Sequence, residues 1–154
     1  MSKALSFEPR DPAFEARCRA SFATQPAMTT LFGARLLTLR PGETEIELVL
    51  RPELLQQMGN VHGGVIGAVA DSAAGYAALS LMAPGLEVVT VEYKINFLAP
   101  AFGQKIIGRG RVVRPGRTLF VCEAEIFSKD DAEERQVAWM TTTMMSVPDP
   151  KIAR

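Results

Sequence analysis

A glycine-rich turn at the expected start of an apolar helix carries the first residues in this sequence that could do chemistry. His62 is the only histidine of the chain, and Gly63 and Gly64 follow it. Backbone amides at a helix N-terminus lack partners and attract negative charge. Because the two glycines have no side chains, a ligand oxygen could approach their amides, and an oxyanion could be held there. The alternative is that these glycines only form a tight turn.

Asp71 is the second candidate, and small residues surround it on the same predicted helix. The positions three and four residues away, which share its face, are Gly67, Ala68, Ala74 and Gly75. No basic side chain stands at these positions, and burial of an unpaired carboxylate is costly. We therefore expect Asp71 to be protonated, to be paired from elsewhere, or to meet solvent and a ligand in a trough between small residues.

Other kinds of site lack the residues that they need. One histidine and two distant cysteines, Cys18 and Cys122, argue against a zinc site. The chain has no G-x-S-x-G, G-x-G-x-x-G or Walker motif. We therefore expect no metal and no other cofactor.

The charge balance and the N-terminal residues also limit the possible functions. Seventeen basic residues balance seventeen acidic ones, so no net field would draw the chain to nucleic acid or to an anionic membrane. The N-terminal residues include Glu8, Asp11 and Glu15 where a secretory signal would need an apolar run. Together with the two separate cysteines, these features predict a cytoplasmic protein.

A local basic run leaves two interpretations open. It consists of Lys105, Arg109, Arg111, Arg114 and Arg117. Charged side chains on a strand and turn are commonly just solvated. The functional interpretation is a docking patch for the phosphates of a nucleotide-bearing ligand.

The elements that must position these residues fit one domain, because 154 residues can bury a sizeable core. Asp11 and Pro12 suit the start of a short helix over 12–23. Strands are expected over 31–39 and 43–50, with a loop or short helical turn over 53–60. The segment from Gly63 to about Met82 is apolar nearly all round, so it should form an enclosed helix. Its central carboxylate argues against a membrane span.

Four strands joined by short turns follow the helix, and this favours a meander. They are expected at about 90–97, 105–113, 117–127 and 137–147. In the first of them, odd-numbered apolar residues alternate with Thr90, Glu92, Lys94 and Asn96. Gly108 and Gly110 share a face and would let the helix come close. The sequence thus predicts an α+β domain, with five or six antiparallel strands curled around one helix and a core over about 31–147.

The turn and the acidic residue resemble the hotdog-fold acyl-CoA thioesterases of the PaaI-like (phenylacetic acid degradation) branch. That pattern has an Asn or Gln, then G-x-x-H-G-G, then an acidic residue on the central helix. The matching residues are Gln56, Gly59, His62, Gly63, Gly64 and Asp71. The resemblance continues through 90–100 and reaches Arg117. It implies the hotdog fold and hydrolysis of a medium-chain or aromatic acyl-CoA to a free acid and coenzyme A.

The resemblance also implies a role for individual residues. The amide of Gly63 would polarise the thioester carbonyl. Asp71, reaching across from a partner subunit, would act as general base on water or as nucleophile. Gln56, where many relatives have Asn, would hold the water or the carbonyl from the side. Thr90 would lie near the attacking water, and His62 would support the loop by hydrogen bonding.

Substrate contacts are expected from Asn60, Gly64 and Arg117. The resemblance further implies a homodimer or homotetramer with its active site at a subunit interface. Two other functions stay open at this point. One is a hydratase or dehydratase that uses His62 and Asp71 jointly, and the other is a module that binds acyl-CoA without cleaving it.

Overall fold

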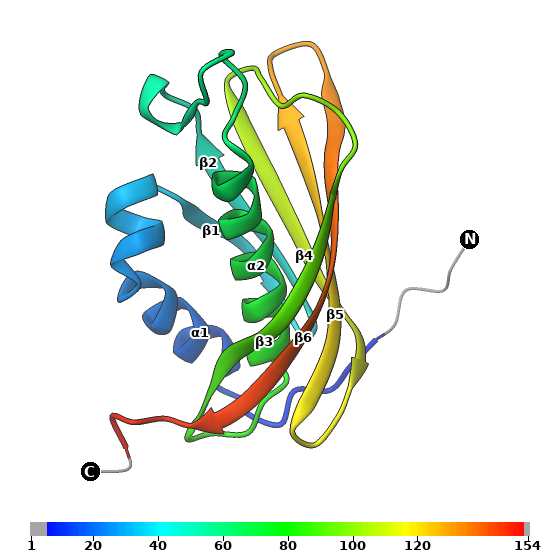
Figure 1. Ribbon diagram of the computed structural model, residues 1–154. Coiled ribbons are helices and arrows are strands. Elements are labelled where there is room, and N and C mark those ends of the chain that lie inside the picture. Colours follow the sequence, from blue (N-terminus) through cyan, green and yellow to red (C-terminus); the bar gives the residue numbers. More distant parts are fainter. Residues whose placement is uncertain (1–5, 153–154) are drawn as a thin grey trace.

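A six-stranded antiparallel sheet curls around one long helix in the computed structural model, which describes residues 6–152 (Figure 1). The strands lie in the order β1-β2-β4-β5-β6-β3. The expected α+β architecture is therefore confirmed. The elements are α1 (Phe14–Ala23), a π-helical turn (Ala27–Phe32), β1 (Arg35–Arg40), β2 (Glu43–Val49), a 3-10 turn (Pro52–Leu54), α2 (Gly63–Leu79), β3 (Leu86–Phe97), β4 (Lys105–Pro115), β5 (Leu119–Lys129) and β6 (Glu134–Pro148).

Helix α2 lies in the hollow of the sheet, as its apolar sequence predicts, and it is nearly enclosed. Glycines on β4 allow the close approach. A Cβ atom on Gly110 would lie 2.2 Å from the backbone oxygen of Ala73, and one on Gly108 would lie 2.8 Å from Cγ1 of Val69. The hydroxyl of Thr44 on β2 donates to the same Ala73 oxygen at 2.6 Å. The prediction that these glycines admit the helix is confirmed.

The predicted meander is wrong for one of its four strands. Strands β4, β5 and β6 do follow one another in the sheet, but β3 pairs with β6 and forms the edge. The connection over 98–104 can reach from this edge back to β4. Three strand spacings are about 14 Å, whereas seven extended residues can span about 23 Å. A short connection therefore does not require neighbouring strands.

The N-terminal region differs from the expectation in two places. Helix α1 begins at Phe14 and not at Pro12, because the first turn is tighter than α-helical: the backbone amide of Phe14 donates to the backbone oxygen of Asp11 at 3.1 Å. Asp11 caps this turn, since its carboxylate accepts the Ala13 amide at 2.9 Å, and it also pairs with Arg17 at 2.7 Å. The strand expected from residue 31 begins only at Arg35. A π-helical turn precedes it and ends at Gly33, whose φ of 74° suits glycine.

Helix α1 is fixed against α2 and covers one side of it (Figure 1). The guanidinium of Arg17 donates to the backbone oxygens of Met82 at 2.9 Å and Leu86 at 3.2 Å, just beyond the end of α2. The rings of Phe22 and Tyr76 meet edge to face, with centroids 5.3 Å apart. No helix within residues 6–152 is long and apolar enough to cross a membrane.

Candidate active site

The N-terminus of α2 offers one free backbone amide. His62 has an extended backbone, and its Nδ1 accepts the Gly64 amide at 2.9 Å. The expected loop-supporting hydrogen bond of His62 is thus present, and it occupies the Gly64 amide. The amide of Gly63 makes no hydrogen bond to the described part of the chain. An oxyanion at this helix end would therefore rest mainly on Gly63.

The turn before α2 brings Gln56 and Asn60 beside this amide. The backbone amide of Gln56 donates to the backbone oxygen of Asn60 at 2.8 Å, and Gly59 closes the turn with a φ of 84°. The side-chain oxygen of Gln56 accepts the Met58 amide, so its NH2 group is left for a ligand. Gln56, Asn60 and Gly63 line one cavity of about 420 Å³.

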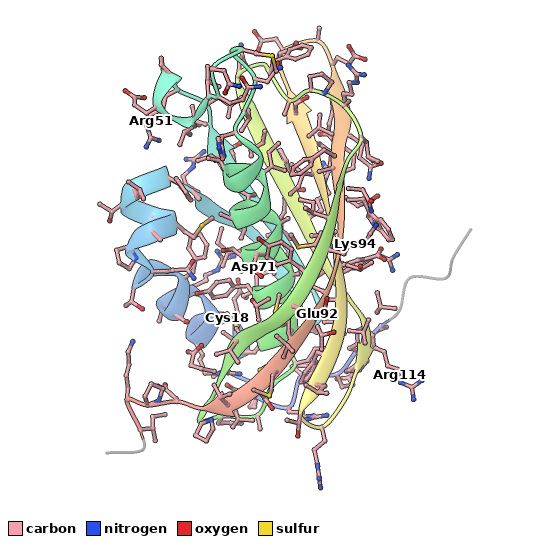
Figure 2. All side chains as sticks on the ribbon, viewed as in Figure 1. Cys18, Arg51, Asp71, Glu92, Lys94 and Arg114 are labelled. Carbon is pink, nitrogen blue, oxygen red and sulfur yellow. The ribbon has the colours of Figure 1, made fainter. Side chains whose placement is uncertain are left out.

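Asp71 lies at the centre of the molecule, on α2 and beside β3 (Figure 2). The hydroxyl of Thr90 donates to its Oδ1 at 2.7 Å. No lysine or arginine of residues 6–152 forms a salt bridge with it. Burial raises the pKa of Asp71 above its ordinary value, and the Thr90 hydrogen bond partly offsets this. Of the three environments expected from the sequence, the structure has the carboxylate facing a cavity, with a volume of about 320 Å³.

Thr90 reaches Asp71 because β3 contains a bulge. The pairing of β3 with β6 shifts register between Thr90 and Glu92. Thr90 therefore points toward α2 together with Tyr93, whose hydroxyl lies 3.6 Å from a Cβ built on Gly67. Simple alternation would put these two residues on opposite faces. Lys94 points to the other side of the sheet (Figure 2).

The two halves of the candidate site are separate within one chain. Gly63 lines the first cavity and Asp71 the second. At about 1.5 Å per residue, the eight steps between them along α2 amount to about 12 Å. Within one chain, the carboxylate and the amide therefore border different cavities.

Both halves touch β3, which is an exposed edge strand. Thr90 contacts Asp71, and a Cβ built on Gly63 would lie 3.1 Å from the ring of Phe97. Between these positions, Val91 is 53% exposed and Tyr93 is 48% exposed. An exposed edge with apolar side chains is a place where another strand can pair.

Residues 58–134 match the family model of the Thioesterase superfamily. The chain belongs to this superfamily. The matched span holds Gly63, Asp71 and Thr90. Because it begins after Gln56 and after α1, those parts of the structure lie outside the shared family region.

Several solved thioesterases have similar structures. A thioesterase family protein from Silicibacter pomeroyi is 46% identical, with a TM-score of 0.85 over 88% of this chain and 99% of that one. A hypothetical thioesterase protein from Streptococcus pneumoniae, solved with coenzyme A, is 27% identical, with a TM-score of 0.66 over 75% and 87% of the two chains. The E. coli PaaI protein shares the fold at 21% identity, with a TM-score of 0.77 over 87% and 94%.

The basic run of this thioesterase-superfamily chain is largely ion-paired on the sheet face away from α2. Lys105 pairs with Glu47 at 2.6 Å, and Arg109 pairs with Glu45 at 2.9 Å. Arg111 pairs with Glu123. These contacts favour a solvated charged surface over a phosphate-docking patch for three of the five residues.

The last of the five, Arg117, is exposed in the turn between β4 and β5 and lines neither cavity of the site. Its substrate contact stays a prediction. Within residues 6–152, no three His, Cys, Asp or Glu side chains are grouped as a metal site would require.

Among the residues that border the Asp71 cavity, the sequence did not single out the polar side chains of Ser21, Gln25, Tyr76 and Glu87. Tyr76 follows Asp71 by little more than one helical turn, so its nearness could be inferred from the helix alone. The other three come from α1, the segment after it, and β3. Only the packing of these elements on α2 brings them together.

Proposed function

We propose that this protein hydrolyses an acyl-CoA at sites shared between two subunits. In each site, Asp71 of one chain and the Gly63 amide of the other act on one thioester carbonyl. The observation that carries the proposal is the separation of the two groups within a chain. Each borders its own cavity, and each lies beside the same exposed edge strand.

Antiparallel pairing of two β3 strands would join the two halves. Directly opposite residues of an antiparallel pair point to the same face. If the twofold axis passes through Lys94, Phe97 of one chain therefore lies opposite the bulge of its partner, which holds Thr90 and Val91. Thr90 marks the Asp71 half and Phe97 marks the Gly63 half. A dimer therefore completes two sites at once, and a tetramer would consist of two such dimers.

In the proposed reaction, Asp71 removes a proton from water as the water oxygen attacks the carbonyl carbon. The negative charge that develops on the carbonyl oxygen is stabilised by the Gly63 amide at the helix N-terminus. The carbon–sulfur bond then breaks, and the proton goes to the departing thiolate, leaving a free acid and coenzyme A. A raised pKa makes Asp71 a stronger base than an ordinary carboxylate. The NH2 group of Gln56 can hold the carbonyl or the water.

Asp71→Asn tests this function most directly. The amide cannot accept the proton, so kcat should fall about 10²–10⁴-fold, while the acyl-CoA still binds. Thiol release measures the rate, and calorimetry with a slowly cleaved thioester measures binding. Asp130→Asn, at the exposed hairpin tip, is the control and should keep the full rate.

Three results would contradict the proposal. A near-normal rate in Asp71→Asn would remove Asp71 from the mechanism. Tight binding of acyl-CoA by the unaltered protein with no thiol release would indicate a binding module. Loss of the conjugated absorbance of an enoyl-CoA without thiol release would indicate a hydratase. Within residues 6–152, no contact favours the hydratase, because Nδ1 of His62 already accepts the Gly64 amide.

A reducing compartment such as the cytoplasm suits this chain. Cys18 and Cys122 are both buried as free thiols. Burial raises the pKa of each thiol to about 12, so neither is a reactive thiolate at neutral pH.

A further inference from the structure

The cavity beside Asp71 ends in a polar wall. Its volume of about 320 Å³ is within the range of small-molecule sites, about 300–1,000 Å³. From Asp71 the cavity follows α2 and β3 past Gly75 to Tyr76 and Glu87. The hydroxyl of Ser21, on α1, lies 3.3 Å from the Tyr76 hydroxyl and 3.5 Å from Oε2 of Glu87.

This wall accepts hydrogen bonds more readily than it donates them. Among residues 6–152, Glu87 has no lysine or arginine within salt-bridge distance, and its side chain receives only the long contact from Ser21. A carboxylate can accept several hydrogen bonds. Gln25 also lines the cavity, and its Oε1 is buried with no partner in the described chain. Burial raises the pKa of Tyr76 to about 12, so its hydroxyl keeps its proton at neutral pH.

The passage from Asp71 to the wall is open because Gly75 has no side chain. A Cβ atom built on Gly75 would meet nothing closer than Met144 and Val88, both at 3.9 Å. Five helical residues separate Asp71 from Tyr76, a rise of about 7.5 Å. Three bonds of an extended chain cover about 3.5 Å, so an acyl chain of about six carbons spans this distance.

We propose that this protein selects acyl groups that carry a hydrogen-bond donor, a hydroxyl or an amine, at the far end. The Glu87 carboxylate accepts a hydrogen bond from this donor. The hydroxyls of Ser21 and Tyr76 form the rest of the polar wall beside Glu87. The inference rests on the proposed function, since it places the acyl group in the cavity that Asp71 borders. It adds a specificity site built from α1 and the start of β3, of which Ser21 lies outside the matched family region.

An acyl group with a methyl end would fit this wall poorly. It would displace water from Glu87 and give no hydrogen bond in return, which is costly for a charged group. Discrimination between an acyl group with a polar end and one with a methyl end can be strong, because a site built to hydrogen-bond a polar group rejects the analogue that lacks this group.

The test uses three thioesters of equal length: hexanoyl-CoA, 6-hydroxyhexanoyl-CoA and 6-aminohexanoyl-CoA. We expect kcat/KM for the better of the two polar substrates to exceed that for hexanoyl-CoA about tenfold or more. Glu87→Leu should abolish or reverse this preference. Glu87→Gln should abolish a preference for the amine, which needs the charge, and keep part of a preference for the hydroxyl. Glu125→Leu, half-buried on the opposite face of the sheet, is the control and should keep the full preference.

Equal or better turnover of hexanoyl-CoA by the unaltered protein would overturn the inference and leave the proposed function intact. So would a polar preference that persists in Glu87→Leu. If no thioester is cleaved, the proposed function fails, and equilibrium binding of the three thioesters then tests recognition by itself. Equal affinities would overturn the inference, whereas a tenfold ranking that Glu87→Leu removes would support it. Tyr76→Phe, which keeps the ring, should reduce the preference for the polar thioesters over hexanoyl-CoA without loss of folding.

Discussion

At the residue scale, the environment of Asp71 determines both its chemistry and its effect on stability. The carboxylate is half-buried and receives one hydrogen bond, from Thr90, without a salt bridge in the described chain. Its pKa is raised above the ordinary value of 3.8 by burial. Since the folded state binds this proton more tightly than the unfolded state, stability falls as the pH rises from 3.8 through the folded pKa.

Asp71→Asn should therefore stabilise the protein at neutral pH. The amide has no charge to desolvate, and its oxygen can still accept the Thr90 hydroxyl. We expect the variant and the unaltered protein to have similar melting temperatures near pH 4, and the variant to melt higher at pH 8. Thermal unfolding followed by circular dichroism across this range checks the difference. A lower melting temperature of the variant at pH 8 would contradict it.

Thr90→Val should change the pH dependence of activity. The Thr90 hydrogen bond favours the ionised form of Asp71, so its loss raises the pKa of the carboxyl further. Asp71 must be ionised to act as a base. The acidic limb of the kcat/KM profile should consequently move to higher pH. Thr143→Val serves as the control, because Thr143 lies on β6 and pairs with Glu92. If the acidic limb moved equally in both variants, the Thr90 hydrogen bond would not be what sets the pKa of Asp71.

At the element scale, the contact between α2 and β4 depends on missing side chains. The Ala73 backbone would meet a Cβ on Gly110 at 2.2 Å, and backbone cannot move aside as a flexible side chain can. The small residues of α2 thus serve two purposes. They let the helix lie close to the sheet, and they leave the trough beside Asp71 open.

Gly110→Ala should destabilise the fold by about 1–3 kcal/mol or more, because α2 must move away from β4. Gly67→Ala is a suitable comparison. Its Cβ would meet only the Tyr93 hydroxyl at 3.6 Å, an ordinary contact, and alanine favours the helix by about 1 kcal/mol over glycine. Urea unfolding of the two variants measures the difference. Equal stabilities would show that the helix does not need this close approach.

At the scale of the whole molecule, the proposed pairing with a second chain rests on the edge formed by β3. Strand β3 carries exposed Val89, Val91 and Tyr93 at this edge. The same strand borders both halves of the candidate site. Pairing through it would cover apolar surface and complete the chemistry in one step.

Mixing two inactive variants tests this assembly. Gly63→Pro removes the amide, and proline suits the first position of a helix, where the preceding His62 already has an extended backbone. A chain with Gly63→Pro keeps Asp71, and a chain with Asp71→Asn keeps the Gly63 amide. A mixed dimer then has one intact site. After unfolding and refolding together, activity should return to about a quarter of normal, since half of the dimers are mixed and each has one of two sites.

The two variants refolded separately provide the control and should remain inactive. No recovery in the mixture would indicate that each site belongs to one chain. Val91→Glu should give monomers by light scattering and lose activity, because pairing of the two strands would then cover a carboxylate of each chain in place of an apolar side chain. A fully active monomer would contradict the shared site.

Local patterns in the sequence were sufficient for the central helix and for the residues that face it. An apolar run with small residues at helical spacing predicts enclosure, and glycines two apart on a strand predict a close neighbour. Asp71, Gly63 and His62 were identifiable for the same reason, because their types and spacing lie within one short segment. These predictions depend only on the size, polarity and spacing of residues within one segment of the chain.

Contacts between distant segments decided the rest. Alternation alone would turn Thr90 away from the helix, and only the bulge against β6 directs it to Asp71. The edge position of β3, the pairing of the basic run with glutamates of other strands, and the wall of Ser21, Tyr76 and Glu87 also depend on packing. No single segment holds both partners of these contacts. The free energy that selects them arises only when the sheet closes around α2 and α1 covers its side.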